Sequence, residues 1–252
     1  YLYVAVGDGD LGRSSRRASQ ILDNLFGKIL RLKDDGTIPD DNPFTGTGTR
    51  CSNGGVSSSD DTTCAEIFAF GLRNPFRFAM DPNSQGNEVR FFVNDVGGKD
   101  WEEISQGGTL FAGANYGWPA KEGPCNLASK TQGCGASNYD EPEFWYQHDV
   151  EEKGCVLGGA FPPNGLWPDK YDNTYLYSDF VFGEIYHLIP DGSSCWSCQP
   201  PTPGYRTESF QVVDRLTSML FGPYQNTQAL YYVTRGEESN VRRIRYTEAQ
   251  TN

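Results

Sequence analysis

The amino-acid sequence predicts an all-β protein, and its leading architecture is a β-propeller of four-stranded blades. Glycine (29) and proline (15) are abundant while methionine (2) is scarce, a balance that favours short strands joined by turns. Three segments also share one pattern, in which an alternating strand follows a glycine or asparagine: residues 27–32, 183–188 and 240–246. Because radial repetition of sheets protects strand edges, this repetition favours a propeller, and a β-sandwich is the alternative.

Short runs rich in Val, Ile, Tyr and Phe define the expected strands, and turn-forming residues separate nearly all of them. In chain order these strands are 2–6, 29–32, 67–70, 76–80, 89–93, 174–177, 185–189, 217–221, 230–234 and 241–246. The only helix that we expect spans residues 14–26, where Ile21, Leu22 and Leu25 share a face, and it should be short. Long loops at 34–64, 119–142 and 200–204 interrupt the pattern, as rim loops of a propeller do.

The charge of the chain limits the classes of partner that it is expected to bind. A formal net charge of −12 and a pI near 4.6 disfavour nucleic acid and anionic lipid surfaces, and fit neutral sugars, cations or basic partners. No apolar run is long enough to span a bilayer, and no signal peptide opens the chain. The first residues already form a strand pattern, so we expect the N-terminal part of the fold to be absent from residues 1–252.

Seven cysteines are more than a reducing compartment usually tolerates outside a metal site, which predicts a secreted or lumenal protein. Loop closure is least costly between near neighbours, which favours the pairs Cys51 with Cys64, Cys125 with Cys134, and Cys195 with Cys198. Cys155 is then free, replaces a partner in one of those pairs, or bridges to a segment outside the chain. Zinc is the alternative for Cys195 and Cys198, although no second CxxC or suitably spaced histidine follows.

Six motifs occur in an order that resembles the glucose/sorbosone dehydrogenase family. The hedgehog-interacting proteins carry a domain that is related to this family. They occupy residues 3–9, 27–32, 35–44, 71–75, 95–104 and 115–119. The second half of the chain matches more loosely, at 158–161, 175–180 and the closing strand near Tyr246. The resemblance implies a six-bladed propeller, of which this chain covers about four blades. It also implies pyrroloquinoline quinone, calcium, and oxidation of a sugar's anomeric carbon with hydride passing to the quinone.

The same resemblance assigns roles to particular residues. Arg73 and Asn74 match the pair that contacts the quinone, and a planar guanidinium suits carboxylates. Arg215 matches the first of two alternating arginines, and Thr217 stands at the second position, which puts quinone binding in doubt. Asp8 matches the acid that orients the catalytic histidine, and this histidine lies upstream of the chain. A structural ion pair is the alternative role for Arg73.

Two calcium sites are implied by the resemblance as well. Gly97 and Gly98 match the loop whose main-chain carbonyls hold the calcium of the cofactor. Glu103 and the carbonyl of Tyr116 match a second, structural calcium site, and capping of backbone amides is the alternative role for Glu103. The acidic pairs at 34–35 and 60–61 lack the spacing of a calcium loop and are expected to be solvated turns.

The remaining candidates are histidines and tryptophans. His148 and His187 do not match the catalytic histidine and are expected to pack within the fold. Trp118, Trp145 and Trp167 are candidate rim aromatics that stack on sugar rings in a carbohydrate-binding propeller, and packing within the fold is their alternative role. Two functions follow: a secreted sugar dehydrogenase that uses a quinone and calcium, or a non-catalytic extracellular propeller stabilised by calcium. The corresponding partners are a small-molecule sugar or an extracellular protein, within a larger chain or assembly.

Overall fold

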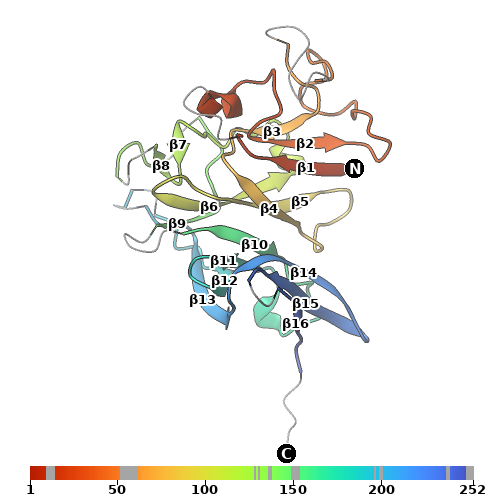
Figure 1. Cartoon of the computed structure of the whole chain (residues 1–252), viewed down its shortest axis with the longest axis vertical. Coiled ribbons are helices and arrows are strands. Elements are labelled where there is room, and N and C mark those ends of the chain that lie inside the picture. Colours follow the sequence, from red (N-terminus) through yellow and green to blue (C-terminus); the bar gives the residue numbers. More distant parts are fainter. Residues whose placement is uncertain are drawn as a thin grey trace, which may run out of the picture.

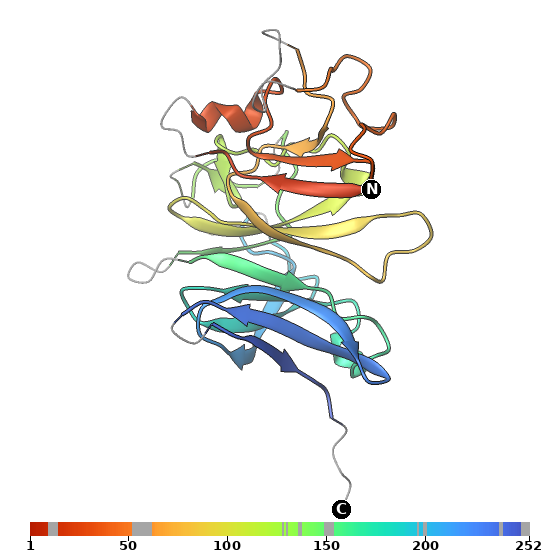
Figure 2. The ribbon, with the colours of Figure 1, turned by 45° about the vertical axis from the view of Figure 1, so that its right-hand side comes forward.

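Four antiparallel sheets follow one another in chain order in the computed structural model (Figure 1). The structure describes residues 1–9, 15–51, 62–127, 129, 131–135, 138–148, 154–195, 197–198, 201–236 and 239–247. Figure 2 shows the same succession of layers after a 45° rotation. The prediction of an all-β chain is therefore confirmed.

The sheets are built mainly from strands that are consecutive in sequence. Sheet 1 contains β1 (Leu2–Val6), β2 (Lys28–Leu32) and β3 (Ile67–Phe70). Sheet 2 contains β4 (Pro75–Met80), β5 (Arg90–Asp95), β6 (Trp101–Gly108) and β9 (Phe144–Gln147). Sheet 3 contains β10 (Val156–Ala160), β11 (Tyr175–Asp179), β12 (Glu184–Pro190) and β13 (Tyr205–Val212). Sheet 4 contains β14 (Leu216–Tyr224), β15 (Thr227–Thr234) and β16 (Val241–Ile244).

Shorter elements fill the connections. The hairpin of β7 (Lys121–Glu122) and β8 (Cys125–Asn126) is inserted between β6 and β9. The 3-10 helices are η1 (Ser15–Gln20), η2 (Thr109–Phe111) and η3 (Asp169–Tyr171). The first strands of successive sheets pack together, β1 with β4, β4 with β10, and β10 with β14. This arrangement of edge strands is that of a β-propeller, in which blades surround a common axis.

Alternating side chains bury both faces of the inner sheets. In β5, Phe91 and Val93 pack in the cluster between sheets 1 and 2, whereas the intervening Phe92 packs in the cluster between sheets 2 and 3. In β11, Leu176 faces the cluster shared with sheet 4, and its neighbour Tyr175 faces sheet 2. Because strand side chains alternate with a period of two, each of these strands holds two interfaces together.

The predicted helix at 14–26 is wrong beyond the short η1. Lys28 is fully buried, and its Nζ donates to the carbonyls of Ala18, Ser19 and Phe26 at 2.6–3.1 Å. An α-helix would use the first two of these carbonyls for amides four residues later. Ala18 instead accepts the amide of Ile21 at 3.2 Å, in the 3-10 manner.

Six strands were not predicted: β6, β7, β8, β9, β10 and β13. Two of them, β10 and β13, have a clear physical reason. Strand β10 contains Gly158 and Gly159, which are poor strand formers, but a Cβ on Gly159 would lie 1.8 Å from the Tyr175 hydroxyl. Close packing against β11 therefore requires glycine there. Strand β13 lies at the sheet edge and is mostly exposed, so its polar residues give no apolar alternation.

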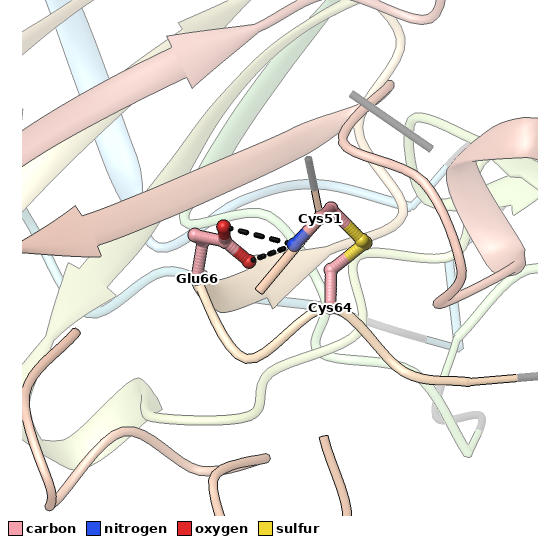
Figure 3. Close-up of side chains that lie close together, drawn as sticks. All are labelled: Cys51, Cys64 and Glu66. Atoms are coloured by element: carbon pink, nitrogen blue, oxygen red, sulfur yellow. Dashed lines mark hydrogen bonds between the residues drawn. A yellow bond between two sulfur atoms is a disulfide. The ribbon is translucent and has the colours of Figure 1, made fainter. Parts of the chain in front are cut away.

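All three predicted disulfides are confirmed: Cys51–Cys64, Cys125–Cys134 and Cys195–Cys198. Cys155 is free. The zinc alternative for Cys195 and Cys198 is wrong, because a disulfide has no thiolate to offer a metal. Figure 3 shows Cys51 and Cys64 beside Glu66, whose carboxylate accepts the Cys51 amide at 3.1 and 3.2 Å. The Cys51–Cys64 disulfide packs against one face of sheet 1.

Other predictions concern loops and the membrane. Asp34 and Asp35 are exposed, and Asp35 accepts the amide and hydroxyl of Thr37, as a solvated turn does. The pair at 60–61 lies outside the described residues. Within the described ranges, the structure has no helix with the length and apolar character needed to cross a membrane.

Candidate functional site

Three segments that are distant in sequence meet at one cavity of about 470 Å³, lined by Val6, Gly7, Asp8, Gly9, Phe26, Arg73 and Asn74. Asp8 follows β1 and is buried, and its amide donates to the Arg73 carbonyl at 2.7 Å. Arg73 and Asn74 form the turn between β3 and β4. The structure thus brings together three of the residues that the resemblance selected.

The Arg73 guanidinium faces the loop after β5. Its Nη1 donates to the carbonyls of Val96 and Gly97, both at 2.6 Å. Its guanidinium carbon lies 5.7 Å from the ring centroid of Trp118, and the indole of Trp118 donates to Asp8 at 3.0 Å. The Gly97 carbonyl, predicted as a calcium ligand, therefore already faces a cation of the protein itself.

Asp95, at the end of β5, holds the turn that contains Arg73 and Asn74 in place. Its carboxylate accepts the backbone amides of Arg73, at 2.9 Å, and Asn74. The Val96 amide returns a hydrogen bond to the Asn74 carbonyl at 3.0 Å. Burial raises the pKa of Asp95 to about 7, against the opposing effect of the two amides and of Arg73. The turn is thus held by its backbone, and both of its residues line the cavity.

Glu103 lies directly opposite Asp95 in the pairing of β5 with β6. It accepts the backbone amide of Gly123, so the capping alternative is part of its role. Burial and then the charge of Asp95 raise its pKa well above the usual range of a glutamate. The phenol of Tyr116 donates to the Gln106 carbonyl, three residues along the same strand, at 2.7 Å. Glu103 is therefore a carboxylate in acidic surroundings.

Glu122 on β7 was not selected from the sequence. Its Oε1 accepts four successive amides, from Gly98, Lys99, Asp100 and Trp101, at 2.7–3.4 Å. Its Oε2 is buried and has no hydrogen-bond partner among the described residues. The carboxylate organises the loop that presents the Gly97 carbonyl. Nothing local in the sequence marks this role, because the amides come from a loop more than twenty residues away.

Several predicted site residues lie elsewhere. Arg215 is exposed in the turn before β14, where its described ion pair is with Asp214 at 3.9 Å. Thr217 lies on β14, and its hydroxyl donates to the Val233 carbonyl. His187 contacts the Thr174 hydroxyl at 2.9 Å, within sheet 3. No contact between these residues and Arg73 is found in the described part of the chain.

The prediction of sugar-stacking tryptophans is wrong. Trp118, Trp145 and Trp167 are all buried, with 3–7% of their surface exposed. Each indole also donates a hydrogen bond, to Asp8, to the Pro201 carbonyl and to the Gln228 carbonyl respectively. Buried tryptophans whose N–H is satisfied are packing residues. Trp118 belongs to the site as a support for Asp8.

Cys155 carries a free thiol close to the same region. Burial, and then the charges of Glu102 and Asp179, raise the pKa of its thiol to about 12. The thiolate that nucleophilic or metal chemistry needs is therefore scarce at neutral pH. Among the described residues, only Cys51, Cys64 and Glu66 place three possible ligand atoms within 4.8 Å of one another, and two of these belong to a disulfide.

Comparison with known proteins agrees with the motifs. The family model described as Glucose / Sorbosone dehydrogenase matches residues 1–163. Over 170 residues the chain is 33% identical to aldose sugar dehydrogenase YliI of Escherichia coli strain K12. This alignment covers 68% of this chain and 35% of that protein. Over 193 residues it is 27% identical to quinoprotein glucose dehydrogenase B of Acinetobacter calcoaceticus, covering 71% and 34%.

A solved structure supports the fold. A chain described as a crystal structure of glucose dehydrogenase superimposes with a TM-score of 0.68 at 18% identity, over 97% of this chain and 61% of that one. At this identity the likeness concerns the fold alone. The chain spans about a third of the length of these curated relatives.

Proposed function

Because this chain belongs to the glucose/sorbosone dehydrogenase family, we propose that its protein is a secreted, calcium-binding sugar dehydrogenase that oxidises the anomeric carbon of an aldose with hydride transfer to pyrroloquinoline quinone. One observation carries the proposal: Asp8, Arg73 and Asn74 converge from separate segments on one cavity. The names of the two relatives support an aldose and a quinone. Three disulfides support an oxidising compartment.

Arg73 and Asn74 would hold the quinone, which when bound supplies the hydride acceptor. The cavity of about 470 Å³ is of the size that small-molecule sites have, and a guanidinium is suited to carboxylates. Gly97 does not fit the calcium of the cofactor in this geometry, because Arg73 already donates to its carbonyl. Gly98 uses its amide to bind Glu122. No role in the reaction is therefore proposed for the calcium of the cofactor.

Asp8 would orient the base that removes the proton of the anomeric hydroxyl. The family resemblance places this histidine upstream of the strand that leads to Asp8, outside residues 1–252. A carboxylate at this position fixes the imidazole tautomer and stabilises the cation that forms.

Glu103 and the carbonyl of Tyr116 would hold the structural calcium. The fit is favourable, since Glu122 leaves one buried oxygen without a described partner, and burial together with acidic neighbours raises the pKa of Glu103. A hard cation would relieve both effects. Because no three carboxylates lie within 4.8 Å of one another among the described residues, the other ligands would be main-chain oxygens. This ion would hold the fold and take no part in the reaction.

The test uses the full-length protein with quinone, calcium and a panel of aldoses, with reduction of a dye as the readout. Arg73→Gln should lower quinone affinity by roughly thirtyfold or more, the effect of losing a charged partner in a closed pocket. Arg77→Gln is the matched control, because Arg77 is exposed on β4 and contacts only the neighbouring Phe76 carbonyl in its described hydrogen bonds. Equal affinity in the two variants would contradict the proposal.

A non-catalytic propeller is the second candidate function, and one observation favours it. Arg73 satisfies the carbonyls of Val96 and Gly97, which is a structural role that needs no cofactor. Arg215 is also exposed, and no described contact joins it to Arg73. Absence of quinone absorbance on the protein, together with absence of turnover for every aldose, would support this candidate.

A further inference from the structure

A buried histidine–carboxylate pair lies between sheets 2 and 3, and no step above uses it. Glu102 on β6 has no exposed surface, and its Oε1 lies 2.6 Å from Nε2 of His148, the residue after β9. Its Oε2 accepts the amides of Val156 at 3.0 Å and Gly97 at 3.2 Å. One carboxylate therefore links the end of β9, the start of β10 and the loop that faces Arg73.

His148 also contacts the same loop through its backbone. Its amide donates to the Asp100 carbonyl at 2.9 Å. Because Glu102 contacts the His148 ring and accepts the Gly97 amide, the two residues together contact the loop at Gly97 and at Asp100.

Close packing gives this pair a single arrangement. A Cβ on Gly154 would lie 2.8 Å from Cγ of Glu102 and 3.3 Å from Cδ2 of His148, so only glycine leaves room for both side chains. A Cβ on Gly97 would lie 1.5 Å from the Trp101 carbonyl oxygen, so the loop also needs glycine where it meets Glu102. Such close packing restricts the rotamers that both side chains can adopt.

We propose that Glu102 and His148 are positioning residues for the cavity, which hold the Gly97 amide and thereby aim the carbonyls of Val96 and Gly97 at Arg73. This inference rests on the proposed function, since the aim of Arg73 matters most where its guanidinium receives a ligand. Without the hydrogen bond from the His148 ring, the buried carboxylate of Glu102 has too few hydrogen-bond donors. It then turns away from the Val156 and Gly97 amides, from which it accepts hydrogen bonds. The loop then loosens and the guanidinium loses its fixed direction.

The experiment compares four forms of the full-length protein: wild type, His148→Phe, His148→Gln and His187→Phe. Phenylalanine removes the ring donors, whereas glutamine retains an N–H that reaches Glu102. His187 is the matched control, because it is also a buried histidine, with 3% of its surface exposed against 9%, but contacts Thr174 in sheet 3. The readouts are hydrogen exchange of the peptide that contains residues 96–101 and equilibrium affinity for added quinone.

In His148→Phe we expect exchange in that peptide to rise, and quinone affinity to fall, by roughly tenfold to a hundredfold, as for one lost hydrogen bond to a charged group. His148→Gln should restore both to within about threefold, and His187→Phe should change neither, whatever its effect on thermal stability. Unchanged exchange in His148→Phe, or equal exchange in His148→Phe and His187→Phe, would overturn the inference. If wild type binds no quinone, the proposed function fails and the exchange rates alone decide whether the pair positions the loop.

Discussion

Calcium should raise the thermal stability of the protein through Glu103, and the size of the effect can be worked from the structure. Glu103 lies opposite Asp95 and near Glu122, whose second oxygen is buried without a described partner. A cation that binds only the folded state at 100 times its Kd adds about 2.7 kcal/mol. For a chain of 252 residues, roughly 2–4 °C of Tm per kcal/mol applies, so the increase should be about 5–10 °C.

Glu103→Gln tests this reasoning directly. The amide oxygen still accepts from Gly123, and the lost charge relieves repulsion with Asp95, so the calcium-free variant should be about as stable as wild type. If the affinity for calcium falls a hundredfold, the same calcium concentration adds only about 0.4 kcal/mol, or about 1 °C.

The assay is thermal unfolding followed by circular dichroism, after chelation and after calcium is restored. Glu143→Gln is the matched control, since Glu143 accepts the Tyr205 hydroxyl at 3.1 Å and its described contacts lie outside this group of carboxylates. It should keep the full calcium shift. An equal shift in Glu103→Gln and wild type would refute the assignment of Glu103, and no shift in wild type would refute the calcium site itself.

Three further predictions concern stability. Replacing both Cys51 and Cys64 by alanine should lower the free energy of unfolding by about 3 kcal/mol in urea titrations, because the disulfide closes a loop across 13 positions; a loss under about 1 kcal/mol would contradict this. Burial lowers the pKa of His187, so the stability that its neutral form contributes is present above about pH 6.5 and is lost as pH falls through the folded-state pKa. Urea midpoints should therefore fall less between pH 7.5 and pH 5 in His187→Gln than in wild type, and an equal fall would count against it. Trp118→Phe removes the indole donor to Asp8 and should cost about 1–3 kcal/mol by thermal unfolding, and no measurable cost would show that the bond is unimportant.

The fold was predictable wherever alternating apolar residues are local in sequence. Strands such as β1, β11 and β15 carry their own pattern, and cysteine pairs close short loops, so both followed from the sequence. The prediction of a helix at 14–26 failed because hydrogen bonds from the buried Lys28 side chain outcompete local helix hydrogen bonds. Strand β10 was missed because its two glycines pack against neighbouring strands, which local propensity cannot reveal.

The site residues also differ in whether the sequence alone could predict their roles. Arg73, Asn74 and Gly97 stand in turn motifs beside strands, and their convergence followed once those strands formed. Glu122 and Glu102 act on amides supplied by other segments, so their function depends on tertiary contacts that a single sequence does not record. Trp118 was assigned to the wrong environment, because an indole on a turn gives the same sequence signal whether exposed or buried.

Asp8 separates the two candidate functions more sharply than Arg73 does. A non-catalytic propeller would keep Arg73 to satisfy the carbonyls of Val96 and Gly97, so its presence fits both candidates. The indole of Trp118 could donate equally well to an asparagine, so Asp8→Asn should change the Tm by less than about 2 °C, within the usual effect of a well-tolerated substitution. An imidazolium beside Asp8 would need the negative charge, and the same variant should then lower aldose turnover by roughly a thousandfold or more. Full turnover in Asp8→Asn would remove Asp8 from the mechanism, since a carboxamide cannot stabilise the cation that the base becomes.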